Sequence, residues 1–104
     1  MAAAPPFVAY ATMSEALVPE SEWPYLYASL QAYKAHVQEY PGCEKMELFA
    51  AVDDDGGMRI HCYTVWDTPE QLDVFLELGY TFERLLVDLE QTDVERSLVM
   101  EKLF

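Results

Sequence analysis

Residues 59–72 constrain the fold more than any other stretch, because they contain a whole strand followed at once by the start of a helix. Between Ile60 and Trp66, side chains alternate between two faces with a period of two, and neither face is strongly polar. Such a pattern is typical of a strand that is covered on both sides. Residues 68–71, with the sequence Thr-Pro-Glu-Gln, form a capping box with proline at the first helical position. We therefore expect a covered strand that ends at Trp66 and leads directly into a helix.

The remaining elements follow from the same two kinds of periodicity. In the first helix, apolar residues recur at alternating steps of three and four as far as Tyr40, and Ser21 is the expected N-cap. Pro41 and Gly42 end this helix, and Gly79 divides the second helical region in two. The expected elements are a strand at residues 7–13, a connection at 14–20, a helix from about 21 to 40, strands at 44–52 and 60–66 joined by a turn at 53–57, helical segments between 69 and 91, and a strand at 96–103.

This order, β-α-β-β-α-β, is that of the ferredoxin-like α+β fold, in which a four-stranded antiparallel sheet carries helices on one face. In a single subunit the other face of such a sheet is bare, and here that face is apolar enough to need covering. We therefore expect a homodimer in which two sheets meet and form a dimeric α/β barrel. Residues 7–104 are expected to form one domain, preceded by a flexible N-terminal tail at residues 1–6.

The chain is strongly acidic, with 6 Lys and Arg residues against 19 Asp and Glu and a formal net charge of −13. Nucleic acids and anionic membranes both require basic patches, so neither is expected as a partner. No apolar run approaches the roughly 20 residues of a membrane span, and residues 1–6 do not have the features of a secretory signal. Cys43 and Cys62 do not form a disulfide pattern, so a reduced, cytoplasmic protein is expected.

Motifs for several common kinds of site do not occur in the sequence. The 2 Cys and 2 His residues do not have zinc-site spacing, and the acidic turn at residues 53–57 is not followed by the glutamate of a calcium loop. The sequence has no glycine-rich phosphate loop and no Ser-His-Asp order with an elbow motif. We therefore expect neither a metal nor a cofactor.

Three stretches resemble the antibiotic biosynthesis monooxygenase family of dimeric α/β barrels. They are residues 39–49, which include Pro-Gly-Cys, the strand at 60–66, and the helix start at 67–76 with Phe82 after it. The resemblance implies a homodimer and a cofactor-independent monooxygenase that uses dioxygen on a quinol-like or polyketide aromatic small molecule. It also implies an alternative, a non-enzymatic small-molecule-binding or stress-response protein of the same fold.

Two positions depart from the family pattern. Many members carry a histidine or tryptophan nine residues after the tryptophan that ends the strand, and this chain has Phe75 there. Haem-degrading members use a histidine further along as the iron ligand, and the matching position here is Leu85 or Leu86. Because leucine cannot bind iron, the resemblance favours an oxygenase without metal over a haem protein.

A cofactor-free oxygenase needs an apolar cavity, a group that favours the substrate's anion, and polar groups that stabilise the charge developing on the peroxide. We expect one such pocket in each subunit, between the sheet and the helices. His61 and Tyr63 share one strand face, so His61 is the expected base or hydrogen-bonding group, and Tyr63 the expected orienting group. The residues expected to bind the substrate are Tyr10, Trp66, Trp23, Tyr33 and His36.

Each of these residues also has a plain structural interpretation. His61 on a strand suits a hydrogen-bonded core or interface position, whereas His36 beside the helix stripe suits the surface. Trp66 suits core packing at the end of its strand. Glu47 is a carboxylate in an apolar strand, which indicates either a site or a dimer interface where it pairs with a basic residue such as Arg59.

Overall fold

The computed structural model describes residues 8–91, 94–101 and 103, so the expected tail at residues 1–6 and Phe7 lie outside the described residues. The elements are β1 (Ala9–Pro19), a 3-10 turn (Glu20–Glu22), α1 (Trp23–Gln38), β2 (Cys43–Val52), β3 (Gly57–Trp66), α2 (Pro69–Leu78), α3 (Phe82–Asp88) and β4 (Val94–Glu101).

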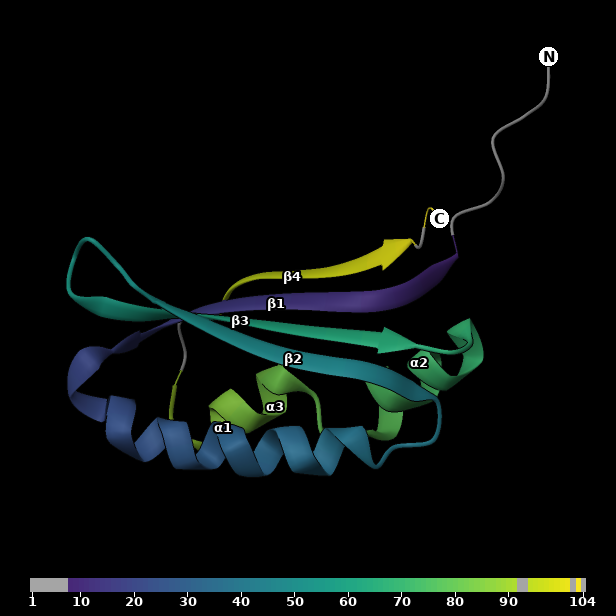
Figure 1. Ribbon diagram of the computed structural model, residues 1–104, viewed down its shortest axis with the longest axis horizontal. Helices are drawn as coiled ribbons and strands as arrows, with labels where there is room; N and C mark the ends of the chain where they lie inside the picture. The colour runs from purple at the N-terminus through teal and green to yellow at the C-terminus, as the bar shows by residue number, and fades with distance from the viewer. Residues whose placement is uncertain (1–7, 92–93, 102, 104) are drawn as a thin grey trace, which may run out of the picture.

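The strands form one antiparallel sheet in the order β2-β3-β1-β4. The helices α1, α2 and α3 all lie on one side of this sheet (Figure 1). This is the ferredoxin-like α+β arrangement that the sequence predicts. The strand that ends at Trp66 is β3, and it is hydrogen-bonded to β2 on one side and to β1 on the other.

Successive side chains of β3 point to opposite faces of the sheet. One set is buried beneath the helices and consists of Met58, Ile60, Cys62, Thr64 and Trp66. The other set is partly exposed on the side of the sheet away from the helices, which we call the outer face, and consists of Arg59, His61, Tyr63 and Val65. This alternation decides which residues can contribute to a site between the sheet and the helices.

β1 is longer than the sequence indicates. The pattern predicts a strand at residues 7–13 and a connection at 14–20, whereas β1 continues through that stretch to Pro19. The polar residues Ser14 and Glu15 look like part of a loop, but both have partners within the fold. Ser14 donates a hydrogen bond to a glutamate of α3, and Glu15 pairs with a histidine of β3. Polar side chains with such partners are compatible with an interior strand.

The start of α1 also differs from the prediction, whereas its end is close to it. Ser21 lies in the 3-10 turn, and the N-cap is Glu22, whose side chain makes no capping hydrogen bond. The helix ends at Gln38, shortly before Pro41 and Gly42. Gly42 has a φ of +84°, a left-handed conformation that glycine adopts without steric cost.

The second helical region is divided at Gly79, as the sequence predicts. The Thr68 hydroxyl caps α2 by accepting a hydrogen bond from the Gln71 backbone N–H at 3.2 Å, which confirms Thr68 as the N-cap. The Gln71 side-chain oxygen accepts from the Thr68 hydroxyl, and not from its backbone N–H as in a full capping box. Thr81 caps α3 in the same way. β4 begins at Val94, two positions earlier than the predicted 96–103, and of the predicted strand Lys102 lies outside the described residues.

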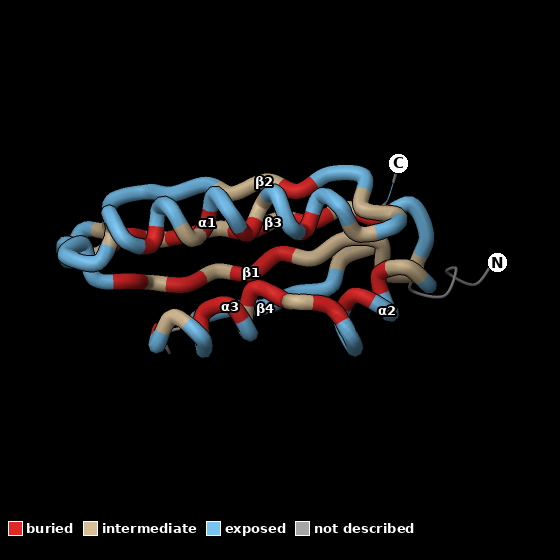
Figure 2. The backbone as a smooth tube through the Cα atoms, turned by 90° about the horizontal axis from the view of Figure 1, so that it is seen from below, coloured by how far each residue is buried: buried red, intermediate tan, exposed pale blue. Residues whose placement is uncertain are grey.

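The core fills the space between the sheet and the helices. Figure 2 shows buried stretches alternating with exposed ones along α1 and α3. Leu26 and Val37 of α1 and Leu72 of α2 are fully buried. The helix stripe that the sequence predicts therefore packs on the sheet, and the buried face of β3 supplies the opposite wall.

We predict that Thr68→Ala lowers the free energy of unfolding by about 1 kcal/mol, because it removes the side-chain oxygen that caps α2. Thr68→Ser keeps that oxygen and should stay close to wild type. Urea unfolding followed by circular dichroism measures both variants. Equal stability of the alanine and serine variants would show that the cap contributes nothing.

Candidate functional site

A cavity of about 170 Å³ lies between the sheet and the two short helices, α2 and α3. Its mouth is marked by three half-exposed residues, Leu76 of α2 and Leu98 and Val99 of β4. Its interior is formed by buried or partly buried residues from β1, α1, β3, α2, α3 and the turn between the two short helices. These interior residues are Thr12, Ser14, Tyr33, Cys62, Thr64, Phe75, Thr81, Phe82 and Glu83.

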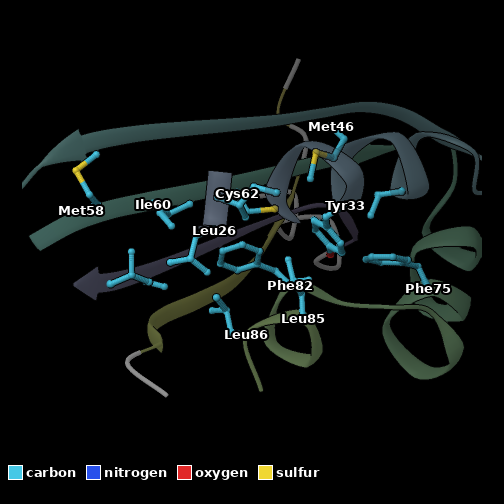
Figure 3. Close-up of a cluster of buried hydrophobic side chains, with 14 of the residues drawn as sticks. Leu26, Tyr33, Met46, Met58, Ile60, Cys62, Phe75, Phe82, Leu85 and Leu86 are labelled. Atoms are coloured by element: carbon cyan, nitrogen blue, oxygen red, sulfur yellow. The ribbon is translucent and has the colours of Figure 1, made fainter. Parts of the chain in front are cut away.

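Aromatic rings form much of the cavity wall. Figure 3 shows the Tyr33 ring between those of Phe82 and Phe75, beneath the strand that carries Cys62. The centroids of the Tyr33 and Phe82 rings are 6.1 Å apart. Phe75 packs against Trp66 at 4.7 Å, so Trp66 supports the wall from behind. Such rings give a flat aromatic molecule favourable contact surfaces.

The Tyr33 hydroxyl is hydrogen-bonded and stays protonated, so it does not suit acid–base catalysis. It donates a hydrogen bond to the Tyr80 carbonyl oxygen at 2.9 Å. Burial, with a smaller contribution from nearby groups such as Cys62 and Glu83, raises the pKa of Tyr33 well above its usual value. Tyr33 is therefore a neutral wall residue rather than a base.

A carboxylate reaches the cavity from α3. The Glu83 oxygen Oε1 accepts a hydrogen bond from Ser14 of β1 at 2.7 Å and another from Ser97 of β4. Glu83 is thus tied to the two strands that form this edge of the sheet. Among the cavity-lining residues it is the only carboxylate in the part of the chain that the structure describes.

A pair of threonine hydroxyls is the second polar feature of the cavity, and Thr12 lies two residues before Ser14 on β1. Thr12 and Thr64 are paired across β1 and β3, and their hydroxyls are hydrogen-bonded to each other. The Trp66 indole N–H donates to the Thr64 hydroxyl at 2.9 Å. Because an indole N–H can only donate, Thr64 accepts there, and its own hydrogen is available for Thr12. In that arrangement the Thr12 hydroxyl has a hydrogen left to donate into the cavity.

A second, more open hollow of about 500 Å³ lies on the outer face of the sheet. His61 and Tyr63 both line it, with their rings stacked at 6.4 Å between centroids. His61 Nε2 lies 3.3 Å from Glu15 Oε1, within the range of an ion pair when the histidine is protonated. The other lining residues are Lys45, Glu47, Phe49 and Val65.

The predicted site residues do not meet in one place. His61 and Tyr63 share a hollow, as their strand face predicts, but it lies across the sheet from the cavity between sheet and helices. The expectation that they line that pocket is therefore wrong. Tyr33 does line the cavity, whereas Trp66 is buried behind Phe75.

The remaining predicted residues lie elsewhere. Trp23 lines a separate hollow of about 260 Å³ beside β2. His36 is exposed, and its ring nitrogen is hydrogen-bonded to the Tyr40 hydroxyl at 3.3 Å. Tyr10 lies near the start of β1 and lines neither the cavity nor the outer hollow.

Glu47 lies on the outer face and, within the subunit, pairs with Lys45 at 2.9 Å. The two roles predicted for it, at a site or at a dimer interface, stay predictions. Arg59 contacts Asp53 at 2.9 Å, Glu15 at 3.6 Å and Glu95. Its hydrogen bonds to Asp53 and Glu95 raise the pKa of Arg59 above its usual value.

Sequence reasoning missed the two groups that give the cavity its polar character, Glu83 and Ser14. Glu83 is an acidic residue in the first turn of a helix, which is common and needs no special explanation. Ser14 follows an apolar run and looked like the start of a loop. The available signal was the helix-facing position of Ser14 once the strand is extended past residue 13.

Metal sites in proteins need several ligating side chains close together. No group of three or more His, Cys, Asp or Glu side chains suited to a metal occurs among residues 8–91, 94–101 and 103. Leu85 and Leu86, the positions matched to the haem ligand, are buried core residues.

No helix in the described ranges is long and apolar enough to cross a membrane.

Comparison with known proteins finds the fold but no sequence relative. Neither a protein-family model nor a curated protein matches the chain. A structure from Nitrosomonas europaea, provisionally named an antibiotic biosynthesis monooxygenase, matches with a TM-score of 0.70 and 14% identity, covering 98% of this chain and 97% of its own. A second, from Chloroflexus aurantiacus J-10-fl and provisionally named likewise, has a TM-score of 0.61 and 19% identity, covering 91% and 93%. At these identities the likeness shows that the chain has the fold of these proteins.

The Cys62 thiol gives a test of the closed cavity wall. Burial, and secondarily the charge of Glu83, raises the pKa of Cys62 to about 12. In a Cys43→Ser variant we expect Cys62 to react with a disulfide reagent at pH 8 far more slowly than after unfolding, because the thiolate is scarce and enclosed. The rate should rise about tenfold per pH unit between pH 7 and 9, since both values lie below the pKa. A plateau near pH 9 would contradict this.

Proposed function

We propose that this protein is a cofactor-independent monooxygenase that oxidises a single-ring, quinol-like aromatic in the cavity between the sheet and α2 and α3. The observation that carries the proposal is the cavity itself, with aromatic walls and a carboxylate at its edge. The names of the two proteins that share the fold point to the same class of chemistry.

The size of the cavity favours one ring. A cavity of about 150 Å³ lined by apolar side chains is large enough for benzene, and this one is about 170 Å³. Pockets for drug-sized molecules are roughly 300–1,000 Å³. A polycyclic polyketide would extend far beyond the mouth, so of the two substrate classes the quinol-like ring fits better.

The reaction needs no electrons from outside the substrate. When a ring hydroxyl loses its proton, the ring becomes electron-rich enough to react with dioxygen. One oxygen atom forms a bond to a ring carbon, and the other leaves as water. For a hydroquinone the balance is hydroquinone plus dioxygen giving a hydroxyquinone plus water, a four-electron oxidation in which the substrate supplies every electron. The protein's share is to bind the ring, exclude water and accept the proton.

We also propose that the outer face is covered by a second copy of the chain. Phe49 is 54% exposed there, and Val65 and Leu17 are partly exposed on the same face. Exposed apolar side chains among the charged residues of a sheet face favour an interaction surface. Closing two such faces together would enclose the outer hollow, so that His61 and Tyr63 would face a space between the two sheets. If His61 and Tyr63 act in catalysis, as the sequence predicts, they would do so in the space between the two sheets. That role stays a prediction.

Oxygen consumption with a panel of aromatic substrates tests the activity. We expect uptake with monocyclic hydroquinones and little with anthrones, and one labelled oxygen atom in the product when the gas is ¹⁸O₂. Phe75→Trp narrows the cavity and should lower kcat/KM by about tenfold or more, whereas Leu78→Trp, exposed on the same helix, should change it less than about twofold.

The same assay separates the competing interpretations. Thermal stabilisation by these aromatics without any product would favour the non-enzymatic binding protein. His61→Ala should retain turnover, because His61 lies across the sheet from the cavity. Loss of turnover in His61→Ala would move the reaction to the outer hollow.

The dimer is tested by analytical ultracentrifugation at micromolar concentration. We expect a species with twice the chain mass of 11.9 kDa. Phe49→Glu places a charge on the outer face and should give a single chain, whereas Val74→Glu, equally exposed on α2, should leave the dimer intact. A wild-type protein that sediments as one chain would refute the barrel.

A further inference from the structure

The two carboxylate oxygens of Glu83 differ in their hydrogen bonds. Both serine hydroxyls, of Ser14 and Ser97, donate to the same carboxylate oxygen, Oε1. Within residues 8–91, 94–101 and 103, no donor makes a hydrogen bond to the other oxygen, Oε2. The adjacent Arg84 does not neutralise the carboxylate, because its guanidinium donates to the carbonyl oxygens of Gly79 and Glu77. One oxygen is thus fixed in place, while the second is left with its full capacity to accept.

We infer that Glu83 is the catalytic proton acceptor of this cavity: its Oε2 accepts the hydrogen bond of the substrate's ring hydroxyl and then takes the proton. This inference rests on the function proposed above. It assigns the base to α3 and to the helix side of the sheet, rather than to His61 on the outer face.

The other titratable groups of the cavity do not suit that role. The Tyr33 hydroxyl is already donating to a backbone carbonyl, and burial keeps it protonated. The Cys62 thiol is buried with its pKa raised to about 12, so it too is neutral at physiological pH. Among the described residues that line the cavity, Glu83 is the only carboxylate, and the two other titratable groups are held as donors.

The proton and the electrons can be followed through the step. The O–H bond of the substrate breaks, its proton moves to Glu83 Oε2, and the electron pair stays on the substrate oxygen and enters the ring. Dioxygen accepts ring electrons and bonds to a ring carbon. When the O–O bond breaks, the departing oxygen takes protons, including the one from Glu83, and leaves as water. Glu83 returns to its carboxylate form.

Ser14 and Ser97 are positioning residues in this scheme. Ser14 belongs to β1 and Ser97 to β4, and the two are direct neighbours in the strand register. Each uses its one hydroxyl hydrogen on Oε1. They therefore orient the carboxylate without occupying the oxygen that meets the substrate.

Binding of phenol and toluene tests the inference, because the two molecules have nearly the same shape and only phenol can donate. Both are titrated into ¹⁵N-labelled protein, and amide shifts at residues 62–64 report occupancy of the cavity. In Glu83→Gln the affinity for phenol relative to toluene should fall by about tenfold or more, while the affinity for toluene changes little. Glu77→Gln removes an exposed carboxylate from the preceding helix and should leave the ratio unchanged.

The outcomes separate the two proposals. If both ligands bind wild type in the cavity and Glu83→Gln keeps the wild-type ratio, the role of Glu83 is overturned and the cavity proposal stands. If neither ligand shifts the cavity residues, the proposed function fails and the role of Glu83 with it. If the Glu83→Gln variant no longer binds toluene, the phenol-to-toluene ratio is measured in Glu83→Asp instead. Aspartate keeps the charge but draws the carboxylate back from the substrate by one methylene. An unchanged ratio there overturns the role of Glu83.

Discussion

The packing of the helices on one face of β3 is the constraint on which the rest of the molecule depends. Because strand side chains alternate, covering that face buries Ile60, Cys62 and Trp66 and at the same time directs His61 and Tyr63 to the opposite side. The two sets cannot contribute to the same enclosed space without a change of register, and a slip of one residue would exchange them. The location of the cavity, the identity of its walls and the character of the outer face all follow from this single choice.

The sequence predicts the architecture well, because the architecture depends on local signals. Alternation in β3, the threonine cap of α2 and the break at Gly79 are each visible within a few residues. The extent of β1 was not predictable in this way, because Ser14 and Glu15 are acceptable in a strand only through partners far away in the chain. Local patterns carry no information about such partners.

The candidate site was predictable only in part, for the same physical reason. Tyr33 was identified because an aromatic residue in a helix stripe must face the sheet. His61 was placed on the correct strand, but periodicity gives two faces without saying which one the helices cover. Glu83 was missed because its significance depends on Ser14, 69 positions earlier in the sequence. A residue of ordinary type at an ordinary helix position becomes notable only when the fold brings its partners together.

Trp66 gives the cavity a natural optical reporter. Its indole is only 1% exposed, it donates to Thr64, and it packs on Phe75, and both of these neighbours line the cavity. The other tryptophan of the chain, Trp23, lines a different hollow beside β2. A molecule that enters the cavity therefore touches the immediate surroundings of one indole and not of the other. The fluorescence of the unmodified protein would register the arrival of a ring without any added label.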